Sequence, residues 1–218
     1  MVSYERTRKE TPESGEGHEV LEEKIRALET ENALLEWHIE YLEEQRGIDT
    51  LTGAKNLGFF KNELEQVLKF VSGEVKEKRI GAESLEKVVL VYVDLDHFKN
   101  INDTLGHPTG DMVLQKVSAA LIDSVRRSDV VARIGGEEFA ILMRNTEIEE
   151  AREHMEKLRA EIEQMTFDEY PDLKVTASFG ITSSDTTDNA ETLRAVADKA
   201  LYAAKHGGRN QVVVQEGE

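Results

Sequence analysis

Two acidic clusters stand where a folded chain could bring them together. The first lies in VVARIGGEEFAILM, residues 130–143, where two glycines and two glutamates separate two apolar runs that each predict a β-strand. The second lies in VDLDHFKNINDTLGHPTGD, residues 93–111, where Asp94 and Asp96 end a long apolar strand. Side chains alternate along a strand, so Asp94 and Asp96 point to one side and Leu95 to the other.

Carboxylates at the end of a buried strand and on a neighbouring hairpin are typical of a Mg²⁺ site. Two such ions about 4 Å apart can hold the attacking and leaving oxygens of a phosphoryl transfer. Gly135 and Gly136 would supply positive φ at the hairpin tip and let a ligand approach the backbone. A GGEE tip alone is most often a solvated turn, so the metal interpretation needs both clusters. Cations for the phosphates are then also required.

Helices and strands alternate beyond Asp49. Helical patterns are predicted at about 57–78, 97–104, 109–125, 147–164 and 190–206. Strands are predicted at 87–96, on both sides of the glycine pair, at 173–183 and from Asn210. The continuous apolar run at 87–96 indicates a central strand covered on both faces. The order contains the βαββαβ arrangement of a ferredoxin-like core, an α/β fold of the α+β type.

Composition excludes several classes of protein. The 218 residues, 39% of them hydrophobic, suffice for one full-sized domain plus an appendage. A formal charge of -17 argues against nucleic acid or an anionic membrane as a partner. The absence of cysteine excludes disulfides, thiolate zinc sites and cysteine nucleophiles. No apolar run approaches the roughly 20 residues of a membrane span, and the N-terminal segment has no signal-peptide core, so a soluble cytoplasmic protein is expected.

A coiled-coil pattern precedes the domain expected at 49–218. Residues 1–18 are polar and predict a flexible leader or linker stump, whereas residues 19–48 have the 3.5-residue repeat of a dimerisation helix. Its seam positions are Leu21, Ile25, Leu28, Asn32, Leu35, Ile39 and Leu42. Isoleucine at a with leucine at d favours a parallel dimer, and the polar Asn32 at a fixes the register. An amphipathic helix packed on its own domain explains the apolar stripe but not the asparagine.

Five blocks between about Asp49 and Val214 resemble, in order, those of the GGDEF-type diguanylate cyclases. They are DTLTGAKN (49–56), DLDHFKNINDTLGHPTGD (94–111), RRSDVVARIGGEEF (126–139), VTASFG (175–180) and ADKALYAAKHGGRN (197–210). The hairpin form GGEEF is one of two associated with active members. Ala54 and Leu57 depart from the family's usual LTGLxNR. The resemblance implies a core of the nucleotidyl-cyclase or polymerase-palm type with a mixed central sheet.

The resemblance implies that two GTP molecules, one on each protomer of a homodimer, condense to cyclic di-GMP and two pyrophosphates. Two Mg²⁺ ions per half-site, with Mn²⁺ as a substitute, would be held by Asp94, the backbone carbonyl of Leu95 and Glu137. The main chain at Gly135 and Gly136 would lie against the α-phosphate. Glu138 would either bind or orient a metal or help to accept the 3′-hydroxyl proton.

The same resemblance assigns the nucleotide contacts. Asn102 and Asp111 would read the guanine edge, since an ionised Asp111 accepts from N–H groups that adenine lacks. The GTP-binding set also includes Phe98, with Lys99, Lys205 and Arg209 on the β- and γ-phosphates and Lys205 acting in catalysis as well. Judged as isolated residues, Asn102 and Asp111 could cap helices, the lysines could be solvated surface charges, and Arg209 could stabilise the end of the last helix.

The segment Arg126-Arg127-Ser128-Asp129 matches the family's RxxD motif, which implies a product-inhibition site. An arginine fork suits a guanine edge or a phosphate, and Asp129 suits the guanine N–H groups. A second cation from the next helix, Lys157 or Arg159, would complete the site. Standing alone, an RxxD pattern is usually a charged turn.

Three functions are compatible with these patterns. The first is an active cyclase whose coil controls the alignment of two half-sites. The second is a non-catalytic receptor or adaptor that only binds GTP or cyclic di-GMP, and the third is a coiled-coil scaffold. The intact Asp94, Glu137, Lys205 and Arg209 favour the first. Family members usually carry an upstream sensor or receiver domain, so we expect either that such a domain is missing from this chain or that the coil itself receives the signal.

Overall fold

The computed structural model describes residues 22, 24–26, 28, 29, 32, 47–74 and 85–215. The chain divides into two compact units, residues 1–42 and 43–218. The described residues of the first unit are helical and exposed, and two predicted seam residues, Ile25 and Leu28, are 48% and 59% exposed. The leader 1–18 and the seam positions Leu21, Leu35, Ile39 and Leu42 lie outside the described residues. None of the described helices combines the length and apolarity that a membrane span requires.

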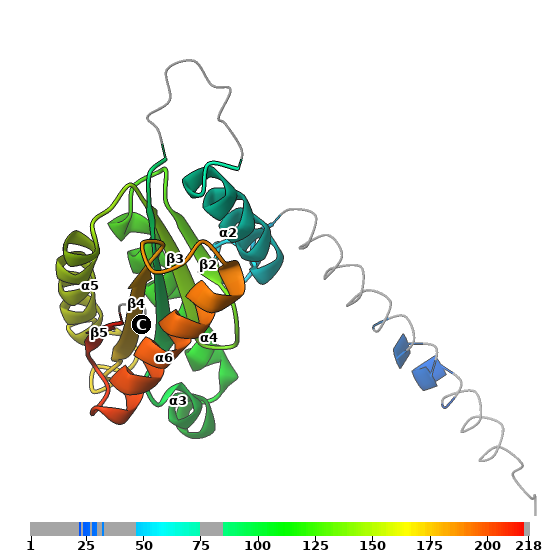
Figure 1. The fold of residues 1–218 in the computed structure, drawn as a ribbon. Helices are drawn as coiled ribbons and strands as arrows, with labels where there is room; N and C mark the ends of the chain where they lie inside the picture. The colour runs from blue at the N-terminus through cyan, green and yellow to red at the C-terminus, as the bar shows by residue number, and fades with distance from the viewer. Residues whose placement is uncertain are drawn as a thin grey trace, which may run out of the picture. The chain divides into compact units, whose positions relative to one another are not determined.

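The second unit contains a five-stranded mixed sheet in the order β2-β3-β1-β4-β5 (Figure 1). The strands are β1 (Val88–Leu95), β2 (Val130–Arg133), β3 (Glu138–Arg144), β4 (Ala177–Ser183) and β5 (Val212–Val214). β1 pairs antiparallel with β3 and β4, β3 pairs antiparallel with β2, and β5 joins β4 in parallel. The order of elements along the chain and the ferredoxin-like core predicted from the sequence are confirmed.

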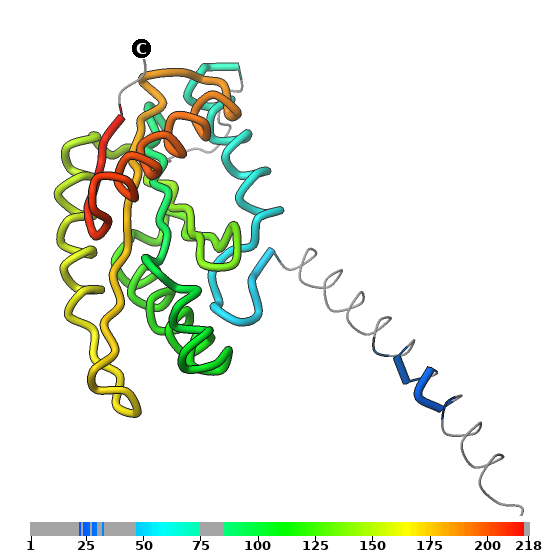
Figure 2. Tube along the Cα trace, turned by 90° about the horizontal axis from the view of Figure 1, so that it is seen from below, coloured from blue at the N-terminus to red at the C-terminus, as the bar shows by residue number. Residues whose placement is uncertain are grey.

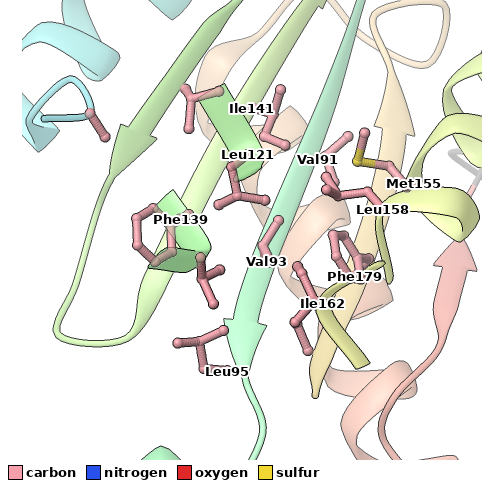
Figure 3. Packing of buried hydrophobic residues seen from close by; sticks show 14 of the residues in the cluster. Val91, Val93, Leu95, Leu121, Phe139, Ile141, Met155, Leu158, Ile162 and Phe179 are labelled. Atoms are coloured by element: carbon pink, nitrogen blue, oxygen red, sulfur yellow. The ribbon is translucent and has the colours of Figure 1, made fainter. Parts of the chain in front are cut away.

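Helices cover both faces of this sheet (Figures 1 and 2). They are α2 (Leu57–Val71), α3 (Phe98–Leu105), α4 (His107–Ser124), α5 (Ile148–Glu163) and α6 (Ala190–His206). All eight residues of β1 are buried, as a doubly covered central strand requires. Val91, Val93 and Leu95 join the core beneath α4 and α5 (Figure 3), while Leu90 and Tyr92 join the core beneath α2 and α6.

Two element boundaries differ from the sequence prediction by more than two residues. α2 ends at Val71 rather than near residue 78, because Ser72 is its C-cap and Gly73 takes a φ of 77°, the left-handed geometry of a helix end. β4 begins at Ala177 rather than at 173, because Ala177 pairs with Leu95, where β1 ends, and earlier residues have no strand beside them. Most of the charged segment predicted at 72–86, residues 75–84, lies outside the described residues.

Candidate active site

Asp94 occupies the end of the central strand and is only 6% exposed. Alternation along β1 directs its side chain toward α6, where Lys205 Nζ lies 2.6 Å from Asp94 Oδ2. α6 can approach this closely because β4 has Gly180 beneath it. A Cβ at Gly180 would overlap the α6 backbone at Ala197 and Leu201.

The environment of Asp94 favours its neutral form. Burial raises the pKa of Asp94 to about 6, Lys205 acts in the opposite direction, and the charges of Glu137 and Glu138 add to the rise. At the end of β1, Asp94 is therefore paired with one ammonium and is also subject to the negative charges of two glutamates. Such a cluster is one that an additional cation would stabilise.

The GGEEF hairpin places both of its glutamates beside Asp94. Leu95 N donates to Glu137 O at 3.3 Å, and Glu138 lies directly across from Asp94 in the β1–β3 register. The prediction that Gly135 and Gly136 supply positive φ is wrong, because the left-handed glycines of the described residues are at other positions. The missing Cβ matters at Gly135, where a methyl group would overlap the Glu138 carboxylate.

Arg133 fixes the hairpin tip to the segment 47–56, which we call the junction turn. Its Nη2 donates to Gly136 O at 2.7 Å, and its Nη1 lies 3.3 Å from both carboxylate oxygens of Asp49. The junction turn is itself bound to β2, because Lys55 N donates to Val131 O and Arg133 N donates to Lys55 O. The hairpin and the start of the domain therefore form one hydrogen-bonded unit.

Asp96 is buried on the same side of the sheet but serves a different purpose. Its Oδ1 accepts from Ser178 Oγ at 2.7 Å, and its Oδ2 accepts from Thr176 Oγ1 at 2.8 Å and from Asn210 N at 2.9 Å. Through these three bonds Asp96 stabilises the turns around the site.

Asn102 is a partly buried residue of α3 that faces α4. Its Oδ1 is buried and has no hydrogen-bond partner among the described residues. The carboxamide fits against Gly110, where a Cβ would overlap Oδ1 and stand 3.1 Å from Phe98 Cζ. Neither Asn102 nor Asp111 caps a helix, because the N-cap residues are His97 and Gly106 and no side chain bonds there. An unpaired buried acceptor is costly unless a ligand satisfies it.

The remaining predicted cations differ in their surroundings. Lys205 lies in the last turn of α6, whereas Lys99 is exposed on the first turn of α3. Arg209 is exposed in the turn after α6, and its backbone N–H donates to Ala204 O, which returns the chain toward the helix end that carries Lys205. Within the described residues, Lys99 and Arg209 have no ion-pair partner.

The RxxD segment borders a separate pocket of about 190 Å³ between β3 and α5. Its lining consists of Ser124, Val125, Arg126, Asp129, Met143, Glu150, Glu153, His154 and Lys157. Arg126 Nη2 already pairs with Glu150 at 2.9 Å, and Asp129 accepts from the backbone N–H groups of Arg126 and Arg144. Of the two cations expected from the next helix, Lys157 lines this pocket.

Arg159 does not line that pocket. Its guanidinium lies between Glu156 and Glu163 and donates to Asn210 Oδ1 at 2.9 Å, beside the turn that follows α6. Two residues apart on a helix, Lys157 and Arg159 point in nearly opposite directions. The sequence alone offered no basis for choosing between them.

Residues 47–211 match the family described as the diguanylate cyclase GGDEF domain. The chain belongs to this family. Diguanylate cyclase DgcP of Pseudomonas aeruginosa is 33% identical over 216 residues, which are 98% of this chain and 31% of that protein. The probable diguanylate cyclase DgcT of Escherichia coli is 37% identical over 172 residues, 77% of this chain and 35% of that protein. The chain thus spans about a third of the length of these relatives.

Solved GGDEF domains have the same fold. The coiled coil and GGDEF domain of DgcB from Caulobacter crescentus, in complex with cyclic di-GMP, gives a TM-score of 0.69 at 27% identity over 89% of this chain and 98% of that one. Diguanylate cyclase SiaD of Pseudomonas aeruginosa, in complex with its activator SiaC, gives 0.65 at 30% identity over 91% and 73%. The predicted family and the palm-like fold are confirmed, and this family generally requires a divalent metal ion.

Sequence reasoning missed several residues that shape this GGDEF domain. Arg133, Gly110 and Gly180 act by contacts between different elements, and an isolated arginine or glycine has no periodic signal. The departure at Ala54 fits the fold, because Ala54 is buried in the main core. Leu57 likewise packs against the core beneath α2 and α6.

Proposed function

We propose that the chain is a diguanylate cyclase that condenses two GTP molecules into cyclic di-GMP and two pyrophosphates across a homodimer. The observation that carries this proposal is the cluster at the end of β1, where the buried Asp94 meets the GGEEF glutamates and Lys205. The unpartnered Oδ1 of Asn102 supports a polar ligand at the α3–α4 pair, and guanine supplies the N–H donor that it lacks.

The donor set fits a divalent cation such as Mg²⁺. Asp94 and Glu137 offer carboxylate oxygens, and Lys205 stands beside Asp94 as a positive charge. No three acidic or histidine side chains in the described ranges form a complete metal cluster, so the main-chain carbonyl of Leu95 would contribute a ligand. When bound, the metal would supply charge stabilisation at the reacting phosphate. Glu138 stays assigned to metal orientation or to the 3′-hydroxyl proton.

The remaining groups would hold the nucleotide. Asn102 and Asp111 would read guanine next to Phe98, while Lys99, Lys205 and Arg209 would bind the β- and γ-phosphates. Each domain offers one half-site, so the reaction requires two domains facing each other, and positioning supplies most of the rate enhancement. A parallel coil at 19–48 would raise the local concentration of the second half-site and set its alignment. An upstream sensor or receiver domain would act through that coil, in the cytoplasm where GTP is available.

The activity can be tested by incubating the purified chain with GTP and Mg²⁺. Chromatography then detects cyclic di-GMP, and a separate assay detects pyrophosphate. Asp94→Ala and Glu137→Ala should each abolish synthesis while the far-ultraviolet circular dichroism remains that of the wild type. Near-normal turnover in either variant overturns the assignment of the metal ligands. A wild-type chain that binds cyclic di-GMP but never releases pyrophosphate would instead be a receptor.

We also propose that the pocket of Arg126, Asp129 and Lys157 binds the product and lowers activity. Support comes from the two cations that line one cavity apart from the hairpin and from the cyclic di-GMP complex of DgcB. Arg126→Ala should leave initial rates largely intact and relieve inhibition by added cyclic di-GMP. Progress curves identical to those of the wild type would show that the RxxD segment is only a charged turn.

A further inference from the structure

The turn between α6 and β5 has an unusual backbone. Gly208, Arg209 and Asn210 have φ values of 122°, 63° and 46°. Two consecutive non-glycine residues with positive φ are disfavoured, and arginine is not among the residues that adopt this region readily. Such a conformation persists only where surrounding contacts determine it, and it is concentrated at functional sites.

Asn210 supplies those contacts. Its backbone N–H donates to Asp96 Oδ2 at 2.9 Å, its Nδ2 donates to Glu163 Oε1 at 2.8 Å, and its Oδ1 accepts from Arg159 Nη1 at 2.9 Å. The backbone donor and both side-chain polar atoms of this residue therefore bond to two other elements, the end of β1 and the helix α5.

The groups that hold Asn210 are themselves fixed. Asp96 is 5% exposed and also accepts from two β4-side hydroxyl groups. Arg159 is held on α5 by Glu156 and Glu163, each at 2.9 Å. Bonds between Asn210 and such preorganised partners leave the turn little freedom, which also fixes the direction of the preceding Cα–Cβ bond at Arg209.

We propose that Asn210 is a positioning residue that presents the Arg209 guanidinium to the polyphosphate of the nucleotide, with Glu163 and Arg159 of α5 as its anchor. This inference rests on the proposed function, in which Arg209 binds the β- and γ-phosphates. The turn bends Arg209 back toward the helix end that carries Lys205, because Arg209 N donates to Ala204 O. Arg159, expected in the product pocket, thus acts on the phosphate side of the domain.

If Asn210 has this role, its replacement should change nucleotide affinity by an amount that depends on how many phosphates the nucleotide carries. Loss of the Asn210 side chain should weaken binding of a triphosphate about tenfold, as expected when a charge-assisted hydrogen bond is lost. Binding of GMP, which has no β- or γ-phosphate, should not change. A general defect in the fold would weaken both ligands together.

The test compares affinities of the full chain for GMP and for guanosine 5′-[α,β-methylene]triphosphate, which cannot release pyrophosphate, by calorimetry with Mg²⁺. Asn210→Ala and Glu163→Ala should lower the ratio of triphosphate to GMP affinity. Glu156→Ala is the matched control, because Glu156 also pairs with Arg159 on α5 but has no hydrogen bond to Asn210, and it should lower the ratio much less than Glu163→Ala does. Glu163 lies on the surface of α5, so this variant keeps the test valid if Asn210→Ala fails to fold.

A double-mutant cycle with Arg209→Ala separates the possible failures. The inference predicts that Asn210→Ala has no further effect on the ratio once Arg209 is alanine. The positioning role is overturned if Asn210→Ala lowers the affinity ratio equally in the Arg209→Ala background. It is also overturned if Asn210→Ala alone does not lower the ratio. Either result leaves the proposed function standing. If Arg209→Ala itself leaves the ratio unchanged, the assignment of Arg209 to the phosphates fails, and this inference fails with it.

Discussion

The buried carboxyl group of Asp94 makes the stability of the metal-free protein depend on pH. Its pKa is about 6 in the folded chain, against an ordinary value of 3.8, chiefly because burial disfavours the charged form. The folded state therefore holds the proton more tightly than the unfolded state does. The stability associated with this group is fully present below about pH 4 and is lost as the pH rises through about 6.

We expect Asp94→Asn, which cannot ionise, to raise the melting temperature of the metal-free protein at about pH 7.5. A rise of about 2–4 °C is expected, since solvent screening reduces the effect of the shift to about 1 kcal/mol. The gain should shrink as the pH falls toward about 5, where the wild-type carboxyl becomes neutral. Thermal unfolding with a chelator present, measured across this range, checks the prediction.

The matched control is Asp111→Asn, which removes one carboxylate charge from the same domain at an exposed position, where burial plays no part. If both variants gain stability equally at all pH values, the gain reflects the reduced net charge of the chain and not the burial of Asp94.

Gly110 is the residue whose replacement should separate stability from binding. Alanine normally stabilises a helix interior relative to glycine by about 0.5–1 kcal/mol. At this position, however, a Cβ would overlap Asn102 Oδ1, so Gly110→Ala should displace the carboxamide and weaken GTP binding roughly tenfold, or about 1.4 kcal/mol. Calorimetry with GTP and a thermal melt of the same sample measure the two effects.

The same substitution in an Asn102→Ala background provides the control. With the carboxamide gone there is no overlap, and Gly110→Ala should then change GTP affinity little. A tenfold loss in both backgrounds would show that Gly110 acts through Phe98 or the helix and not through Asn102.

At the scale of elements, periodicity predicted which segments are helices and strands, and their order is confirmed. β1 was recognisable because a doubly covered strand is apolar throughout. The attachment of the hairpin to the junction turn was not predictable, since Asp49 and Arg133 are 84 residues apart and each alone resembles a surface charge. The choice between Lys157 and Arg159 was left open for a related reason, because sequence spacing does not show which side of a helix faces which pocket.

The contact between hairpin and junction turn should control catalytic rate more than stability. Arg133→Lys keeps the charge but loses the fork that reaches Gly136 O and Asp49 together. We expect kcat to fall roughly tenfold, because small displacements of positioning groups are costly, with little change in the free energy of unfolding. Arg127→Lys, an exposed arginine of the same region, serves as the control in the cyclic di-GMP assay. Equal rates for all three proteins would show that the Arg133 contact does not position the hairpin.

At the scale of the whole molecule, the proposed reaction links the coil to the site through symmetry. Two half-sites must face each other, so whatever fixes the coil register also fixes how often they meet. The junction turn begins at the end of the predicted coil, and Arg133 binds it to the GGEEF hairpin.

Asn32→Leu tests the coil. Loss of the polar residue at this a position should strengthen the association of the helices. It should also remove the preference for one register and for two strands, so that higher oligomers or other registers form. Sedimentation analysis should then show a change in mass, accompanied by a change in cyclase activity per chain at unchanged GTP affinity per protomer. A variant that remains dimeric with wild-type rates would mean that the coil is a passive tether.

The 2.6 Å contact between Lys205 and Asp94 has a further consequence, which concerns the order of assembly. If a divalent ion is held by Asp94, it would compete with this ammonium for the carboxylate, and Lys205 would then be available to pair with a phosphate. Ion and polyphosphate binding are then thermodynamically linked, and by reciprocity each must strengthen the other by the same factor. Without the ion, Asp94 has Lys205 as its counter-ion, so a nucleotide that arrived without a metal ion would meet a lysine already paired with this carboxylate.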